Sequence, residues 1–130
     1  MAIDLRIASQ RAINELSSLY RAKRGSLIKS NLPTVDLSLQ EGKAIFYRIY
    51  RLILNSHNLP SDCKMRVETM KDLENDKWLI SVSSNVAQIE EQPQVELRQL
   101  IEKAGGELSV EKKVKGTVIW FTLPCKKLKL

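Results

Sequence analysis

Hydrophobic and polar positions between residues 37 and 58 repeat with the period of an amphipathic helix. Large apolar residues recur at steps of three or four, which places them on one helical face at about 100° per residue: Ile45, Phe46, Ile49, Leu52 and Ile53. Tyr47, Tyr50 and Leu54 form a second apolar strip. A helix with two apolar strips contacts two layers or a partner, so we predict that this helix is the centre of the fold.

The ends of this helix are also marked in the sequence. Asp36 or Ser38 is expected to cap the first turn, because either side chain can accept a hydrogen bond from its free amides, and Glu41 completes a capping box with Ser38. The last turn carries four polar residues, Asn55–Asn58, before Pro60 stops the helix. The chemistry of these polar side chains is the main functional question.

Residues 2–23 carry another helical pattern, with a period near 3.5 residues. Its apolar stripe is wide enough for one side to pack on the domain and the other on a second copy of the chain. A helix packed only on its own domain is the alternative. The residues expected to take part in such contacts are Leu5, Ala12, Leu16 and Leu19, together with Tyr47 and Tyr50 of the central helix.

Strands and one further helix account for the remaining chain. Alternating or continuous apolar positions between turn residues predict strands at residues 26–32, 64–70, 78–83, 107–110 and 117–123. A helix over residues 93–104 is expected to end at Gly105-Gly106. This order predicts an α+β fold, a two-layer sandwich with helices on one face of a mostly antiparallel sheet.

The sequence divides into three parts on this interpretation: the N-terminal helix in residues 1–25, a domain over residues 26–125, and a basic tail at residues 126–130. A chain of 130 residues with 43% hydrophobic and 28% charged residues can bury a core of its own. No apolar run resembles a signal peptide or a membrane span, so we expect a cytoplasmic protein. The two cysteines have neither disulfide nor zinc-site spacing.

Positive charge is unevenly distributed along the chain. The net charge of +6 is made up of +5 in residues 1–60, −5 in residues 61–111 and +6 in residues 112–130. Such a pattern suits contact with nucleic acid, an acidic protein or a membrane surface, and also a solvated surface. The residues that would contact nucleic acid are Lys112, Lys113, Lys115, Lys126, Lys127 and Lys129. Aromatic residues make up only 5% of the chain, so no stacking platform accompanies these lysines.

Three segments carry a resemblance to a known family. Leu32-Pro33-Thr34-Val35-Asp36 leads into the central helix, which ends in Arg51-Leu52-Ile53-Leu54-Asn55-Ser56, and the chain closes with Gly105-Gly106, a predicted hairpin and Leu123-Pro124. With the order of elements, they resemble the ATP-binding domain of sensor histidine kinases, in the superfamily of gyrase and MutL, over nearly the whole chain. The resemblance implies that Asn55 stands where the family has a magnesium-binding asparagine. A helix cap or a solvated side chain is the alternative for Asn55.

Other motifs of that family are altered here. Residues 82–88 stand where the family carries V-x-D-N-G-x-G, so the adenine-recognising aspartate is replaced by serine and both glycines are absent. Residues 91–95 replace the glycine-rich segment expected before the last helix. ATP binding needs that carboxylate and the close backbone approach that glycines allow, and no acidic pair accompanies Asn55 to organise magnesium. We therefore expect no cofactor, no ATPase activity and no kinase activity.

No other catalytic constellation is supported by the sequence. His57 is the only histidine and lies at the end of the central helix, where a partly buried polar residue or a helix C-cap is favoured over phosphotransfer. Nothing places Cys63 or Cys125 beside it as a nucleophile. Our leading hypothesis is a non-catalytic signalling adaptor or regulator that binds a protein partner, with a homodimer through residues 2–23 as one form of contact. The alternatives are a nucleic-acid-binding regulator and a divergent ATP-binding kinase domain.

Overall fold

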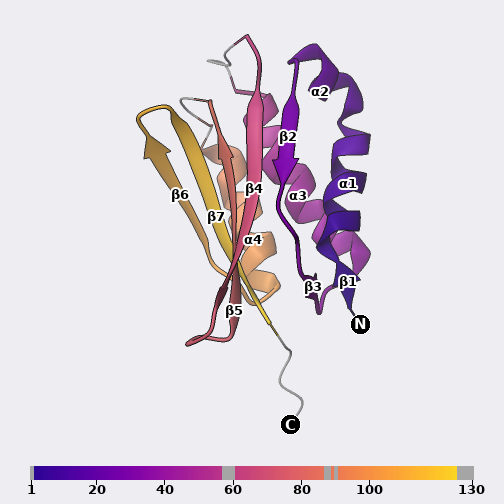
Figure 1. The fold of residues 1–130 in the computed structure, drawn as a ribbon, viewed down its shortest axis with the longest axis vertical. Coiled ribbons are helices and arrows are strands. Elements are labelled where there is room, and N and C mark those ends of the chain that lie inside the picture. The colour runs from indigo at the N-terminus through magenta and orange to yellow at the C-terminus, as the bar shows by residue number, and fades with distance from the viewer. Residues whose placement is uncertain (1, 57–60, 87–88, 90, 126–130) are drawn as a thin grey trace.

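The computed structural model describes residues 2–56, 61–86, 89 and 91–125 (Figure 1). Within these residues the main sheet has the order β2-β4-β5-β7-β6. Its strands are β2 (Ser26–Lys29), β4 (Lys64–Asp72), β5 (Lys77–Ser84), β6 (Leu108–Lys113) and β7 (Gly116–Pro124). β2 pairs with β4 in parallel, and the pairs β4–β5, β5–β7 and β6–β7 are antiparallel. The mostly antiparallel sheet expected from the sequence is therefore confirmed.

The larger helices form a layer on one side of this sheet. They are α1 (Leu5–Glu15), α3 (Leu39–Leu54) and α4 (Gln92–Lys103), and a short α2 (Ser17–Ala22) follows α1. α3 and α4 lie behind the strands in the view of Figure 1, whereas α1 lies beyond the edge strand β2, beside α3. α3 packs against α1 on one side and α4 on the other. A small antiparallel ribbon of β1 (Ile3–Asp4) and β3 (Thr34–Val35) joins the N-terminus to the segment before α3. The two-layer α+β sandwich is as predicted.

The core lies between α3 and the inner face of the sheet. The ring of Phe46 lies edge-on to that of Phe121 on β7, with 5.9 Å between centroids, and is stacked on Tyr50 at 5.8 Å. Ile80 and Val82 bring the inner face of β5 into the same buried cluster. Both apolar strips of the central helix are thus used, because α3 has neighbours on its sides as well as beneath it.

The capping box of α3 is confirmed. The Ser38 hydroxyl accepts a hydrogen bond from the Glu41 amide at 3.1 Å, and a Glu41 carboxylate oxygen accepts one from the Ser38 amide at 3.3 Å. The predicted end at residue 58 is wrong, since the helix ends at Leu54 with Asn55 as its C-cap. His57 and Asn58 lie outside the described residues.

The predicted single helix over residues 2–23 is also corrected. Ile3 and Asp4 form β1, the Asp4 carboxylate caps α1 by accepting from the Arg6 amide at 2.9 Å, and the helical run breaks at Leu16 before α2 begins. The predicted strand 26–32 is shorter, ending at Lys29. Among the described residues, no helix is long and apolar enough to cross a membrane.

Candidate functional site

Two places bear on function, and the first lies where β5 ends. Asn85 follows the last residue of β5, and its side chain is held by the start of β4: it accepts from the Lys64 amide at 2.9 Å and donates to the Asp62 carbonyl at 2.8 Å. The Asn85 amide also donates to the Lys64 carbonyl at 3.2 Å. These bonds fix the direction in which the chain leaves the sheet, so that Val86 turns inward.

Apolar side chains fill the space beyond this turn. Val86 is 0% exposed and Ile89 is 7% exposed, and both belong to the buried cluster that contains Leu97 and Ile101 of α4. The hydroxyl of Thr117, at the start of β7, donates to the Val86 carbonyl at 2.8 Å and is itself in a buried residue. We call Ser84, Asn85, Val86, Ile89 and Thr117 the closed strand end.

The closed strand end covers the positions at which the family motif has its aspartate and first glycine. Ser84 stands at the aspartate position, and its hydroxyl lies 3.4 Å from the Val86 amide and 3.5 Å from the Thr117 carbonyl. Val86 stands at the glycine position. A hydroxyl engaged with neighbouring backbone and a buried isopropyl group do not reproduce a carboxylate aimed into a cavity, so these residues do not fit the adenine site of the resembled family.

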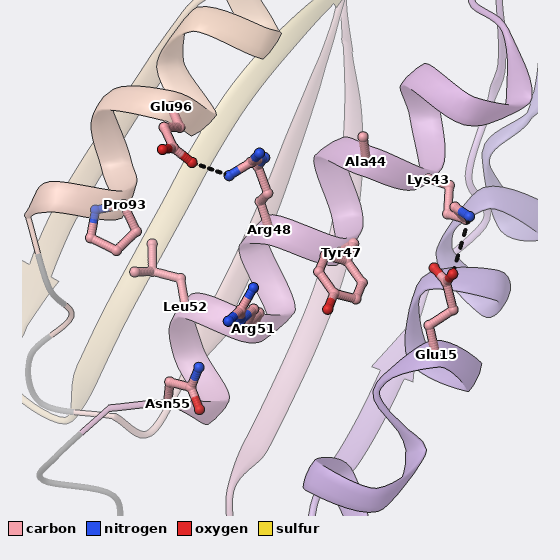
Figure 2. Close-up of a pocket in the computed structure, with 10 residues that line it drawn as sticks. All are labelled: Glu15, Lys43, Ala44, Tyr47, Arg48, Arg51, Leu52, Asn55, Pro93 and Glu96. Atoms are coloured by element: carbon pink, nitrogen blue, oxygen red, sulfur yellow. Dashed lines mark hydrogen bonds and ion pairs between the residues drawn. The ribbon is translucent and has the colours of Figure 1, made fainter.

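The second place is a groove of about 810 Å³ that runs along α3, with α1 on one side and α4 on the other (Figure 2). α1 contributes Glu15 to its lining, and α4 contributes Pro93 and Glu96. The residues of α3 and its C-cap that line the groove are Lys43, Ala44, Tyr47, Arg48, Arg51, Leu52 and Asn55. We call this set of ten residues the α3 groove.

Ion pairs form the two walls of the α3 groove. Figure 2 shows Lys43 reaching Glu15 on α1, with 3.3 Å between Nζ and Oε1, and Arg48 reaching Glu96 on α4. Arg51 lies between these walls and is exposed, and no ion pair to it is found within the described part of the chain. The groove therefore presents one cation that its own residues leave uncompensated.

Asn55 is exposed at one end of the α3 groove. Glu15 and Glu96, the carboxylates that line the same groove, are each paired with a cation. Among residues 2–56, 61–86, 89 and 91–125, no group of three or more His, Cys, Asp or Glu side chains could hold a metal ion. The oxygen ligands that magnesium requires are not gathered around Asn55, so the residues described do not fit a magnesium site there.

The predicted contact residues fall into two groups. Leu5, Ala12, Leu16 and Tyr50 are buried inside the chain, so they offer no surface to a partner in this conformation. Leu19 is partly exposed, and Tyr47 lines the α3 groove. The α1 stripe packs on the chain's own α3, which is the alternative that the sequence left open.

Tyr50 is a structural link between two helices. Its hydroxyl lies 2.6 Å from the Ser9 hydroxyl of α1, and both side chains are fully buried. Burial raises the pKa of Tyr50 well above its usual range, which the Ser9 hydrogen bond offsets only in part. Tyr50 thus lies in the core, whereas Tyr47, three residues earlier, lines the α3 groove.

Three of the six candidate nucleic-acid residues lie in the part of the chain that the structure describes. Lys112, Lys113 and Lys115 are exposed at the β6–β7 turn, where Lys113 pairs with Glu111 at 2.7 Å. The strand β7 leads away from this turn, and the described chain ends at Cys125, at the other end of the sheet (Figure 1). Lys126, Lys127 and Lys129 lie outside the described residues.

Neither cysteine has the surroundings of a nucleophile. Cys63 is buried, and burial raises the pKa of its thiol to about 11. Burial and, to a smaller extent, the nearby Asp76 raise the pKa of the Cys125 thiol. Reactive thiolates need a lowered pKa, so no covalent chemistry is indicated at either residue.

Sequence reasoning missed the α3 groove, although its signal is present. Lys43, Tyr47, Arg51 and Asn55 follow one another at four-residue steps and so form a single row along α3. The sequence does not show that α1 and α4 flank this row, because that depends on how three helices pack on the sheet.

Comparison with solved structures places the fold. The catalytic domain of histidine kinase ThkA matches 95% of this chain and 94% of its own, with a TM-score of 0.76 and 13% identity. The Acinetobacter baumannii histidine kinase AdeS matches over 98% and 68%, with a TM-score of 0.79 and 6% identity. The mycobacterial sensor histidine kinase MprB matches over 95% and 97%, with a TM-score of 0.70 and 13% identity.

No protein-family model and no curated protein sequence matches the chain. At sequence identities this low, the structural matches show the fold and do not show an activity. They agree with the resemblance drawn from the Leu-Pro segments, the central helix and the Gly-Gly turn. The chain therefore has the fold of the catalytic, ATP-binding domain of sensor histidine kinases.

Proposed function

We propose that this chain is a non-catalytic member of the histidine-kinase-like fold that acts in signalling as an adaptor or regulator, through contacts with a protein partner. One observation carries the proposal: Val86 is buried at the closed strand end and its carbonyl accepts a hydrogen bond from Thr117. A nucleotide base would have to displace this buried side chain and break this bond. Seven residues separate β5 from α4, which leaves little chain to cover bound phosphates.

The loss of nucleotide binding is tested by isothermal titration of the intact chain with ATP and magnesium. We expect no saturable binding up to millimolar nucleotide. A histidine kinase catalytic domain that keeps the aspartate and both glycines serves as the positive control. Micromolar, magnesium-dependent binding to this chain would contradict the proposal and would favour a divergent ATP-binding kinase domain.

Nucleic-acid binding is the second candidate, because three exposed lysines gather at the β6–β7 turn. Phosphate contacts release counterions, so binding through these lysines must weaken steeply as salt is raised. Filter binding with a DNA duplex at two salt concentrations measures this. Replacement of Lys112, Lys113 and Lys115 by glutamine should remove any binding that the turn provides, and absence of binding at low salt eliminates this candidate.

A further inference from the structure

The α3 groove has the length of a helix. Its row of side chains runs along α3 from Lys43 to Asn55, which at about 1.5 Å per residue corresponds to roughly 18 Å. α1 and α4 lie on either side of α3. An open groove flanked by two helices accepts an elongated segment more readily than a compact ligand, and a hydrophobic groove is a common binding site for an amphipathic helix.

Part of the lining of the groove is apolar. Ala44, Tyr47 and Pro93 are each partly exposed, and Leu52 closes the bottom with 5% of its surface accessible. An occupant gains free energy by covering these surfaces with aliphatic side chains. A purely polar ligand would leave this part of the groove unused.

Charge fixes where an acidic side chain of the occupant must lie. Glu15 and Glu96 already neutralise the cations of the two walls, and their carboxylates repel a further anion there. Arg51, between the walls, is exposed and has no ion-pair partner within the described ranges. A guanidinium presents paired N–H groups in a plane, which match the two oxygens of a carboxylate. The favoured position for a carboxylate is therefore the midline of the groove, over Arg51.

The groove is poorly built for a free phosphate group. Tight phosphate sites use backbone amides at glycine-rich turns or helix starts. The amides of α3 are used within the helix, and Pro93, at the start of α4, has no N–H to offer. Arg51 must act through its side chain alone, which suits a carboxylate on a segment held in place by apolar contacts.

We propose that the α3 groove binds an amphipathic helix of a partner protein, with a carboxylate side chain of that helix paired to Arg51 and aliphatic side chains covering Ala44, Tyr47 and Pro93. This inference rests on the proposed adaptor function and names the chemistry of its partner. The partner helix lies along α3, between α1 and α4.

The probe is a pair of labelled peptides of about 15 residues, long enough for helical structure. One carries glutamate on one face and leucine on the adjoining face, and the other has every glutamate replaced by glutamine. Fluorescence anisotropy with the intact chain should give saturable binding of the glutamate peptide and at least about tenfold weaker binding of the glutamine peptide.

Two arginine substitutions locate the site. Arg51→Gln should weaken the glutamate peptide about tenfold and leave the glutamine peptide unchanged. Arg11→Gln removes the same charge from an exposed position of α1 that does not line the groove, and should leave both affinities unchanged. Tyr47→Ala should weaken both peptides, because it removes apolar contact and not charge. Thermal unfolding of each variant shows whether it is folded.

Several results would overturn the inference: equal affinities for the two peptides, no binding at millimolar peptide, or equal effects of Arg51→Gln and Arg11→Gln, which would indicate diffuse attraction. Inorganic pyrophosphate that displaced the peptide more strongly than acetate would show a phosphate site and would also overturn it. The titration with ATP and magnesium tests the proposed function separately. If neither the peptide nor ATP binds, the proposal of a helix in the α3 groove is rejected and the proposed function stands. If ATP binds, the proposed function is rejected.

Discussion

The closed strand end lies at one end of β5, the α3 groove lies on the layer of helices, and the two differ in what covers them. At the closed strand end, the side chains of Val86 and Ile89 are buried in the core, and the Thr117 hydroxyl donates a hydrogen bond to the Val86 carbonyl. At the α3 groove, long polar side chains stand in a row that α1 and α4 flank without covering. Apolar residues after a strand end collapse inward, whereas a row of charged residues keeps a helical face open.

This contrast has a functional consequence. In the resembled family, the end of the equivalent strand recognises a base, and here the chain's own side chains fill that position. The α3 groove retains an exposed cation and apolar floor that nothing in the described chain occupies. On the proposed function, a change at one of these places need not alter the other, because the closed strand end and the groove depend on different residues.

The largest difference between the two regions is expected when an aspartate is placed in each of them. Val86→Asp should lower the free energy of unfolding by about 3–5 kcal/mol, because it buries a carboxylate without a cation. Asn55→Asp should change it by less than about 0.5 kcal/mol, because the new charge is solvated. Urea unfolding at pH 7 measures both. If Val86→Asp cost no more than Asn55→Asp, the strand end would be open to water.

The buried thiol beside the sheet gives a pH test. Burial raises the pKa of Cys63 to about 11, whereas a thiol in the unfolded chain titrates near about 8.5. The unfolded state therefore loses its proton first, so this contribution to stability is complete below about pH 8.5 and is lost as pH rises towards 11, by at most about 3 kcal/mol. The free energy of unfolding, measured with urea across this pH range, should decline less steeply for Cys63→Ala than for the unsubstituted chain. Parallel declines would show that Cys63 is not shielded.

Loss of a tyrosine hydroxyl is expected to cost more stability in the core, at Tyr50, than in the α3 groove, at Tyr47. Tyr50→Phe removes the buried hydrogen bond to Ser9 and should cost about 1–2 kcal/mol of unfolding free energy, since the Ser9 hydroxyl is left buried. Tyr47→Phe should cost less than about 0.5 kcal/mol, because water replaces any partner of its hydroxyl. Thermal and urea unfolding compare them. A larger cost for Tyr47→Phe would place Tyr47 in the core.

The smallest effect is expected at the walls of the groove. Glu96→Gln breaks the ion pair with Arg48. Because the side chains of Glu96 and Arg48 are 63% and 43% exposed, this substitution should change the unfolding free energy by less than about 0.5 kcal/mol. The same measurement in high salt should show even less difference, because exposed pairs are screened. A cost above 1 kcal/mol would mean that the wall is part of the stable core and that the groove is more rigid than an exposed surface.

Local patterns were sufficient for much of the fold. The Ser38–Glu41 capping box, the alternating strands and the Gly-Gly turn are each decided by neighbours in sequence, and the structure confirms them. The errors are also local: helix α3 ends at Leu54 and the N-terminal helix breaks at Leu16, because cap geometry is a compromise among several nearby residues. The role of Asn55 and the homodimer through residues 2–23 stay predictions.

The sequence by itself determined the order of elements, the layer architecture, the resemblance to histidine kinase ATP-binding domains, and the substitution of serine and valine in the adenine motif. Periodicity and turn chemistry act over a few residues, so they are readable in one dimension. Only the tertiary structure decided that Val86 is buried beneath a Thr117 hydrogen bond, that Tyr50 faces Ser9, and that Arg51 lies in a groove between α1 and α4. These facts join residues from distant parts of the chain, and such neighbours are set by packing on the sheet.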